Sequence, residues 1–362
     1  MQTVDDDAQA DAPPRRRRRR ARALGADLAV LAVVGVLLTG AFAATGAVLY
    51  RDLYSPAAFV TRYLDLLSRK QAADALALPG VAIDSAQASA TGLPSGASEA
   101  LLRSSALGAL SDVSVQSAEE RPDGTTAVAV RYTAGGHEGS TVFSVERAGW
   151  VGVAPTWRFA KSPLAAVDLT VRGARQFSVN GFGVDTRQVS PQRENADPLT
   201  PVSLLVFSPG LYSISVDTPV SASAGVAVLS DTPQASIPVD LQTVPTDRFR
   251  QAIQDEVESF LTACATQQVL QPTGCPFGLV VRNRIDSPPT WTMVQQPQIS
   301  LVPHGADWAI QRASAVAHID VVIRSIFDGS TRHLDEAVPF SVGGTVTILP
   351  DGTASIQVTD GN

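Results

Sequence analysis

An uncharged, largely apolar stretch from Leu28 to Tyr50 is the strongest pattern in the chain. A helix rises about 1.5 Å per residue, so roughly 20 apolar residues cross the hydrocarbon of a bilayer. The stretch has about that length and contains no proline. It therefore predicts a transmembrane helix over 28–50.

Arginines just before this stretch set the expected orientation. They are Arg15, Arg16, Arg17, Arg18, Arg19, Arg20 and Arg22. Basic residues close to a span stay on the cytoplasmic side. We therefore expect a disordered basic cytoplasmic tail over 1–27 and an extracytoplasmic body from Arg51 onward. The predicted localisation is the cell membrane, as a single-pass protein with its N-terminus cytoplasmic and its C-terminal domains extracytoplasmic.

A cleaved signal peptide is the alternative interpretation of this stretch, since Ala41 and Ala43 resemble a small-residue cleavage site. Signal peptides have an apolar region of about 7–15 residues, which is shorter than this one. An uncleaved anchor is favoured, and whether it is ever cleaved stays open. The arginine run serves as an orientation signal, with weak attraction to anionic lipid heads. No nucleic-acid partner is expected.

Helical periodicity follows the apolar stretch. Ser55 and Pro56 are typical of a helix cap and a first helical position. One apolar stripe then continues through Phe59, Tyr63, Leu66 and Leu67. Shorter helices are expected at 71–78 and 99–107, followed by four strands with glycine turns. The pattern predicts an α+β domain over 56–164, with a helix on a curved antiparallel sheet.

The periodicity changes twice more along the chain. Alternating apolar residues between Gly and Pro breaks predict a small all-β module over 166–244. Thr246 then caps the clearest helix, and long strands follow it to the end. This order predicts a second α+β domain over 246–362. The expected fold is thus a single transmembrane helix plus a multidomain ectodomain of α+β, all-β and α+β modules.

Composition narrows the class of protein. Hydrophobic residues make up 44% of the chain, which supports packed cores rather than disorder. The formal net charge is −7, which argues against electrostatic capture of a polyanion. Alanine and arginine are common whereas lysine is rare, a bias typical of GC-rich bacterial genomes such as those of actinobacteria.

The chain has two cysteines, Cys264 and Cys275. An extracytoplasmic pair can oxidise, and bridging these two would close a short loop. Metal binding is the alternative, but two thiolates without further ligands do not complete a tetrahedral site. The spacing favours a disulfide in the last domain.

Recognisable catalytic motifs are absent from the sequence. The four histidines are His137, His304, His318 and His333, and none belongs to an HExxH pattern. No GxSxG elbow occurs, and the glycine-rich VNGFGVD lacks the helix that phosphate binding needs. We predict a non-enzymatic protein with no catalytic, cofactor-binding or metal-binding residues and no cofactor.

The four tryptophans, Trp150, Trp157, Trp291 and Trp308, lie near strand starts. Stacking on sugars of a cell-wall polymer would be their functional role. Closing the ends of the sheet cores is the structural alternative, and it is favoured.

Two resemblances extend this interpretation. The helix FVTRYLDLLSRKQAADALAL and the strands ending in TWRFAKSPL resemble the nuclear transport factor two-like cone fold over 56–164. That superfamily includes ketosteroid isomerases and pocket-bearing domains without activity. The resemblance implies a cone-shaped domain, and no catalytic role is carried over to Asp65 or Tyr63.

The overall architecture resembles TcaA-type single-span envelope proteins of Gram-positive bacteria. Their β modules are similar to FSVNGFGVD and SPGLYSISVDTP here, where an NG segment precedes a PG-Y turn. The zinc ribbon usual in that group is missing, because no Cys precedes the apolar stretch.

Taken as a whole, the sequence predicts a membrane-anchored protein with a structural or recognition role in the bacterial cell envelope. Its expected partners are the lipid bilayer and a cell-wall component or membrane protein. The alternative is a small-molecule binder or cone-fold enzyme with a pocket in 56–164. Asp65 converging with Glu146 or Arg158 in an open cavity would favour it. A cavity filled by side chains such as Phe59, Phe143 and Trp157 would favour the non-enzymatic interpretation.

Overall fold

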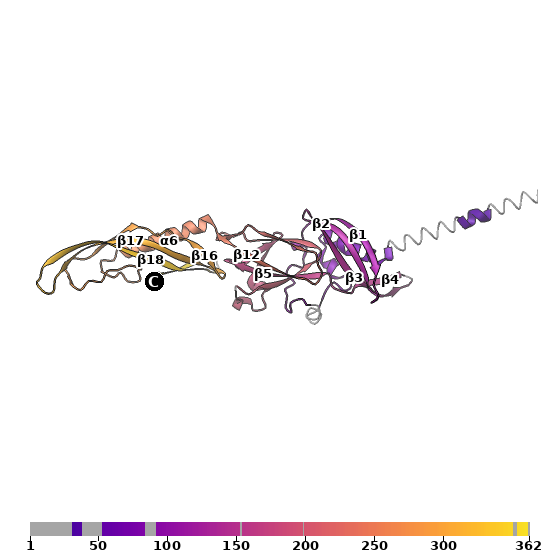
Figure 1. The fold of residues 1–362 in the computed structure, drawn as a ribbon, viewed down its shortest axis with the longest axis horizontal. Coiled ribbons are helices and arrows are strands. Elements are labelled where there is room, and N and C mark those ends of the chain that lie inside the picture. The colour runs from indigo at the N-terminus through magenta and orange to yellow at the C-terminus, as the bar shows by residue number, and fades with distance from the viewer. Residues whose placement is uncertain are drawn as a thin grey trace, which may run out of the picture.

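The computed structural model describes residues 31–37, 53–83, 92–152, 154–197, 199–349 and 353–360. From residue 53 onward they form three modules, arranged in a row along the longest axis of the molecule (Figure 1). We call 53–163 the first module, 164–245 the second module and 246–360 the third module. The fold is mixed α+β, with strands as the main element throughout.

In the first module a helix packs on an antiparallel sheet. Helix α2 (Pro56–Ser68) begins where the Ser55 hydroxyl oxygen accepts a hydrogen bond from the Ala58 N–H at 3.1 Å. Helix α3 (Ala72–Leu76) follows it. The strands pair in sequence order and are β1 (Leu110–Glu120), β2 (Thr126–Ala134), β3 (His137–Val151) and β4 (Ala154–Phe159).

The prediction of a helix at 99–107 is wrong. That segment contains only a 3₁₀ turn, η1 (Ser104–Ala106), preceded by Arg103 in an extended conformation. An extended residue cannot continue a helix, so any helical turn at 99–102 ends there.

Aromatic rings fill the space between α2 and the sheet. Phe59 and Tyr63 project from the helix and meet Phe143 and Phe159 from the sheet, with ring centroids 5.0–5.9 Å apart. The Tyr63 hydroxyl also donates a hydrogen bond to the Ser208 carbonyl of the second module at 3.0 Å. Burial raises the pKa of Tyr63 well above its ordinary value, so the phenol stays neutral. This cluster closes the interior of the first module.

Two sheets share one core in the second module. One sheet has the order β12 (Ser236–Gln242), β5 (Leu164–Arg172) and β8 (Val202–Phe207), with β12 parallel to β5. The other has the order β11 (Val226–Ser230), β9 (Gly210–Ser215), β6 (Gln176–Val179) and β7 (Phe182–Asp185). Remaining elements are α5 (Thr186–Val189), η2 (Arg193–Asn195) and the paired β10 (Ser221–Ala222) and β13 (Val244–Pro245).

The PG-Y segment of this module makes a turn that a buried tyrosine holds in place. The Tyr212 hydroxyl donates to the Phe207 carbonyl at 3.0 Å and accepts from the Phe207 N–H at 2.9 Å. A Cβ at Gly210 would lie 3.0 Å from the Tyr212 ring, so glycine leaves room for it. The Ser208–Pro209 peptide bond in the same turn is cis.

The third module lays a long helix on a six-stranded sheet. Helix α6 (Asp247–Ala265) begins where the Thr246 hydroxyl oxygen accepts from the Phe249 N–H at 3.2 Å. The strands are β14 (Arg284–Ile285), β15 (Thr290–Gln295), β16 (Leu301–His304), β17 (Asp307–Arg324), β18 (Thr331–Ile348) and β19 (Ala354–Asp360). Every strand except β19 pairs with β17, and β19 pairs with β18. The β17–β18 hairpin extends to the far end of the molecule (Figure 1).

The predicted transmembrane helix over 28–50 requires correction. Of that segment the structure describes 31–37, as a helix of about two turns. Residues 28–30 and 38–50, like the tail 1–27 with its arginines, lie outside the described residues. Among the helices that the structure describes, none combines the length and apolar character needed to cross a bilayer. This finding contradicts the single-pass membrane interpretation and the localisation based on it.

A prediction concerns the cysteine pair. The Sγ atoms of Cys264, at the end of α6, and Cys275, in the loop that follows, are 2.02 Å apart. The sequence separation of 11 residues gives about 3 kcal/mol of stabilisation by chain entropy. We expect Cys264→Ser with Cys275→Ser to lower the free energy of unfolding of the third module by about that amount, measured by urea denaturation. Reductant should destabilise the wild type and leave the double variant unchanged. Alkylation of both thiols in the native protein without reductant would contradict the bridge.

Candidate functional site

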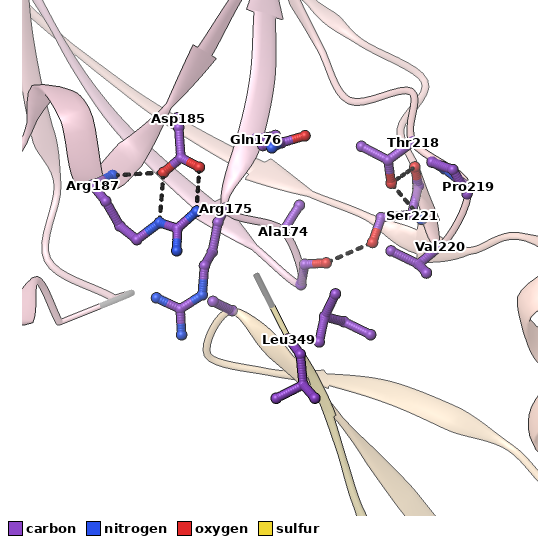
Figure 2. A pocket seen from close by; sticks show the side chains of 13 residues that line it. Ala174, Arg175, Gln176, Asp185, Arg187, Thr218, Pro219, Val220, Ser221 and Leu349 are labelled. Carbon is purple, nitrogen blue, oxygen red and sulfur yellow. Dashed lines mark hydrogen bonds and ion pairs between the residues drawn. The ribbon is translucent and has the colours of Figure 1, made fainter. Parts of the chain in front are cut away.

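A cavity of about 160 Å³ lies where the second module meets the third. We call it the junction pocket. The segments that form it are the β5–β6 and β9–β10 loops, the start of α5, the β16–β17 turn and the end of β18 (Figure 2). Its lining residues are Gly173, Ala174, Arg175, Gln176, Asp185, Arg187, Thr218, Pro219, Val220, Ser221, Ala306, Ile348 and Leu349.

The base of the junction pocket is a close backbone contact at Gly173. The Gly173 N–H donates to the Gly305 carbonyl of the third module at 2.8 Å, and its carbonyl accepts from the Ser221 hydroxyl at 2.7 Å. Gly173 has φ +81°, and a Cβ there would lie 2.5 Å from Thr243 Oγ1 and 3.2 Å from Trp308 Cζ2. Only glycine fits this conformation and this space.

One wall of the junction pocket is charged. Asp185 is 8% exposed and caps α5 by accepting from the Arg187 N–H at 2.9 Å. The Arg187 guanidinium binds the same carboxylate through two hydrogen bonds, of 2.9 and 2.7 Å. Burial disfavours the ionised carboxylate. The hydrogen bonds from Arg187 and the charges of Arg187 and Arg175 outweigh that effect and hold the pKa of Asp185 below its ordinary value.

Arg175 is the second arginine of this wall, and it is only partly buried. Its backbone carbonyl accepts from the Thr186 N–H at 2.9 Å, which fixes the start of its side chain. The side chain extends past the Asp185–Arg187 pair toward the third module (Figure 2). Within the part of the chain that the structure describes, no side chain forms a hydrogen bond or ion pair with its guanidinium. Arg175 can therefore receive an anion.

The opposite wall is apolar. It consists of Val220 from the second module with Ala306, Ile348 and Leu349 from the third. Leu349 is 41% exposed at the rim. The junction pocket thus combines one available cation with an apolar surface, an arrangement typical of sites for small ligands.

The hydroxyl groups at this site are engaged internally. Ser221 Oγ donates to the Gly173 carbonyl, and Thr218 Oγ1 donates to the Ser221 carbonyl at 3.1 Å and accepts from the Ser221 N–H at 2.9 Å. No histidine is among the described residues that line the junction pocket. The Ser221 and Thr218 hydroxyls thus hold the β9–β10 loop in place through backbone groups.

The ionisable residues that would have favoured an enzyme lie on the surface of the first module. Asp65 pairs with Arg69 on the exposed side of α2, at 2.8 Å. Glu146 and Arg158 pair across β3 and β4, also at 2.8 Å. The structure therefore does not bring Asp65 together with Glu146 or Arg158 in a cavity.

The histidines of the third module satisfy carboxylates on a neighbouring strand. His318 Nε2 lies 2.5 Å from Asp335 Oδ1, and His333 Nε2 lies 2.8 Å from Asp320 Oδ1. Among the described residues, no three or more His, Cys, Asp or Glu side chains are placed to hold a metal ion. His137 and His304 are exposed at ends of strands.

The tryptophans divide into two groups. Trp291 and Trp308 are buried in the third module, as the structural alternative expects. Trp150 is 59% exposed, and Arg147 lies over its ring and over that of Trp157, at 5.2 and 5.6 Å from the ring centres. Trp157 donates its indole N–H to the Tyr54 carbonyl at the surface. Trp157 is therefore not among the side chains that fill the interior of the first module.

Arg175, Asp185 and Arg187 were not predicted from the sequence as site residues. Asp185 alone is a weak signal, because aspartate is a common residue at the N-cap of a helix. The apolar wall from the third module follows more than a hundred residues later, and nothing in the sequence pattern connects the two.

Comparisons with protein families, with curated proteins and with solved structures found no match to this chain.

The first prediction from this site concerns Gly173. Gly173→Ala should destabilise the contact between the second and third modules, because the methyl group would clash with Thr243 and Trp308. Gly181→Ala is the matched control: Gly181 has φ +85° in the same module, and a Cβ there has no neighbour within 4 Å. Thermal unfolding should show a loss of about 1–2 kcal/mol for the control, from the left-handed backbone alone. The loss for Gly173→Ala should be clearly larger, and equal losses would contradict the close contact.

A second prediction concerns the pH dependence that Asp185 confers. A carboxyl whose pKa is lowered in the folded state contributes stability above its unfolded pKa of about 3.9, and this is lost as pH falls through the folded pKa. Asp185→Asn keeps the cap but removes the charge. We expect it to lower the free energy of unfolding by about 1–3 kcal/mol at pH 7, with the difference shrinking below about pH 4. Urea denaturation between pH 7 and pH 2.5 measures this, and a constant difference would contradict it.

Proposed function

We propose that this chain is a non-enzymatic recognition protein that binds a small ligand in the junction pocket. The proposal rests on the Arg175 guanidinium, which forms no hydrogen bond or ion pair with a described side chain and lies in the same pocket as apolar side chains of the third module. A partly buried cation without a partner is unfavourable, and an anionic ligand would relieve that cost.

The rival site, a pocket in 56–164, receives less support. Phe59, Tyr63, Phe143 and Phe159 pack against one another and fill the space between α2 and the sheet. A helix on an antiparallel sheet is compatible with a cone-like first module, and we propose that relationship for its architecture only. The filled interior favours a structural role for this module.

The arrangement of the modules bears on the partner that we propose for this chain. A cell-wall component or a membrane protein is the proposed partner class, and the row of three modules would present the junction pocket at a distance from the first module (Figure 1). The surface pair Trp150 and Trp157 is a second place where sugar rings could stack, but Arg147 already covers part of both indoles.

A fragment screen on the full-length chain tests the proposal. Saturation-transfer NMR would detect binders from a library of anionic, neutral and cationic fragments. We expect several hits that are lost in Gln176→Trp, because Gln176 is exposed at the rim and an indole there would obstruct the junction pocket. Ser213→Trp is the matched control, since Ser213 is exposed on β9 of the same sheet and does not line the junction pocket.

Hits that survive Ser213→Trp and disappear in Gln176→Trp would support binding at the junction pocket. Hits that persist equally in both variants would place binding elsewhere and overturn the proposal. A screen without any hit would also overturn it.

A further inference from the structure

We infer that the junction pocket selects a small ligand with one carboxylate group attached to a compact apolar body. This inference rests on the function proposed above and names the class of ligand.

Arg175 provides the positive charge that the junction pocket offers to a ligand. Asp185 already occupies Arg187 through two hydrogen bonds to its guanidinium, and among the described residues Arg175 lacks such a partner. A guanidinium presents parallel N–H groups that match the two oxygens of a carboxylate. The Arg175 side chain is therefore suited to a single planar anion.

The Asp185 carboxylate limits the ligand to one negative charge. Asp185 pairs with Gln176 across β6 and β7, so its carboxylate lies near Arg175 in the junction pocket. A second negative charge on the ligand would meet this carboxylate in a half-buried site, where like charges repel strongly. Phosphate monoesters and dicarboxylates are therefore disfavoured relative to a monocarboxylate.

The volume and the apolar lining of the junction pocket determine the size and polarity of the rest of the ligand. Val220, Ile348 and Leu349 form an apolar surface in the junction pocket, which favours an apolar body on the ligand. The volume of about 160 Å³ is close to that of an apolar cavity of about 150 Å³ that binds benzene. A body the size of one six-membered ring would fill the space.

The hydrogen-bond donors of the junction pocket determine how the ligand is oriented. Ser221 and Thr218 donate their hydroxyl hydrogens to the carbonyls of Gly173 and Ser221, so neither hydroxyl is available to donate to the carboxylate of a ligand. The carboxylate then lies at Arg175, and the apolar body lies between the second and third modules.

Isothermal titration calorimetry on the full-length chain, with three probes, tests this class. Sodium benzoate should bind with a Kd on the order of 1 mM. Benzamide has the same shape without charge and should bind at least about tenfold more weakly, because it loses a charge-assisted pair. Phthalate carries a second carboxylate and should also bind more weakly than benzoate.

Variants assign the selectivity to its residues. Arg175→Gln should weaken benzoate binding by about tenfold or more. Arg172→Gln is the matched control, because Arg172 pairs with Asp240 outside the junction pocket, and it should change the Kd by less than about twofold. Leu349→Asp at the exposed rim should weaken benzoate more than benzamide, which would assign the effect to charge even if Arg175→Gln folded poorly.

The outcomes separate this inference from the proposed function. Equal affinity for benzoate and benzamide, unchanged by Arg175→Gln, would overturn the carboxylate class while the fragment screen could still support binding at the junction pocket. Absence of benzoate binding up to about 10 mM, ten times the expected Kd, would overturn the inference directly. Failure of the proposed function is recognised separately, because fragments would then bind the Gln176→Trp variant as well as they bind the wild type.

Discussion

The close approach of backbone segments at Gly173 is the constraint on which the candidate site depends. The Gly173 peptide binds the β16–β17 turn on one side and Ser221 on the other, with Thr243 and Trp308 near its α-carbon. These contacts bring the β5–β6 loop of the second module against the third module. The charged wall and the apolar wall then face each other, so a backbone requirement at one glycine determines the geometry of a site made by side chains elsewhere.

Local signals predicted the helices better than anything else in this chain. The Ser55 and Thr246 caps start α2 and α6 where the sequence indicates, because a side-chain oxygen satisfies a free N–H at each helix start. The cysteine spacing also anticipated two sulfurs at bonding distance. Two patterns without such a local cause failed. The apolar stretch 28–50 predicted a span that the described helices do not support, and 99–107 gave a single 3₁₀ turn.

The candidate site could not be predicted, because its parts are brought together only by tertiary structure. Arg175 and Asp185 lie at the ends of adjacent strands, whereas Leu349 comes from the last hairpin of another module. The histidines, to which we assigned no role from the sequence, do not line the site either, and His318 binds Asp335 on the neighbouring strand. The tryptophans were expected to close the ends of sheet cores, whereas Trp150 is exposed and the Trp157 indole binds the Tyr54 carbonyl at the surface. The sequence does not distinguish a polar residue that binds a neighbouring side chain from one that is available to bind a ligand.

A crystal structure of the full-length chain soaked with benzoate would test the central claim most directly, since it reports where the carboxylate lies. The account predicts the ring between Val220 and Leu349, with both carboxylate oxygens within hydrogen-bond distance of the Arg175 guanidinium and the Asp185–Arg187 pair intact. Benzoate bound elsewhere, with Arg175 turned away toward solvent, would contradict it.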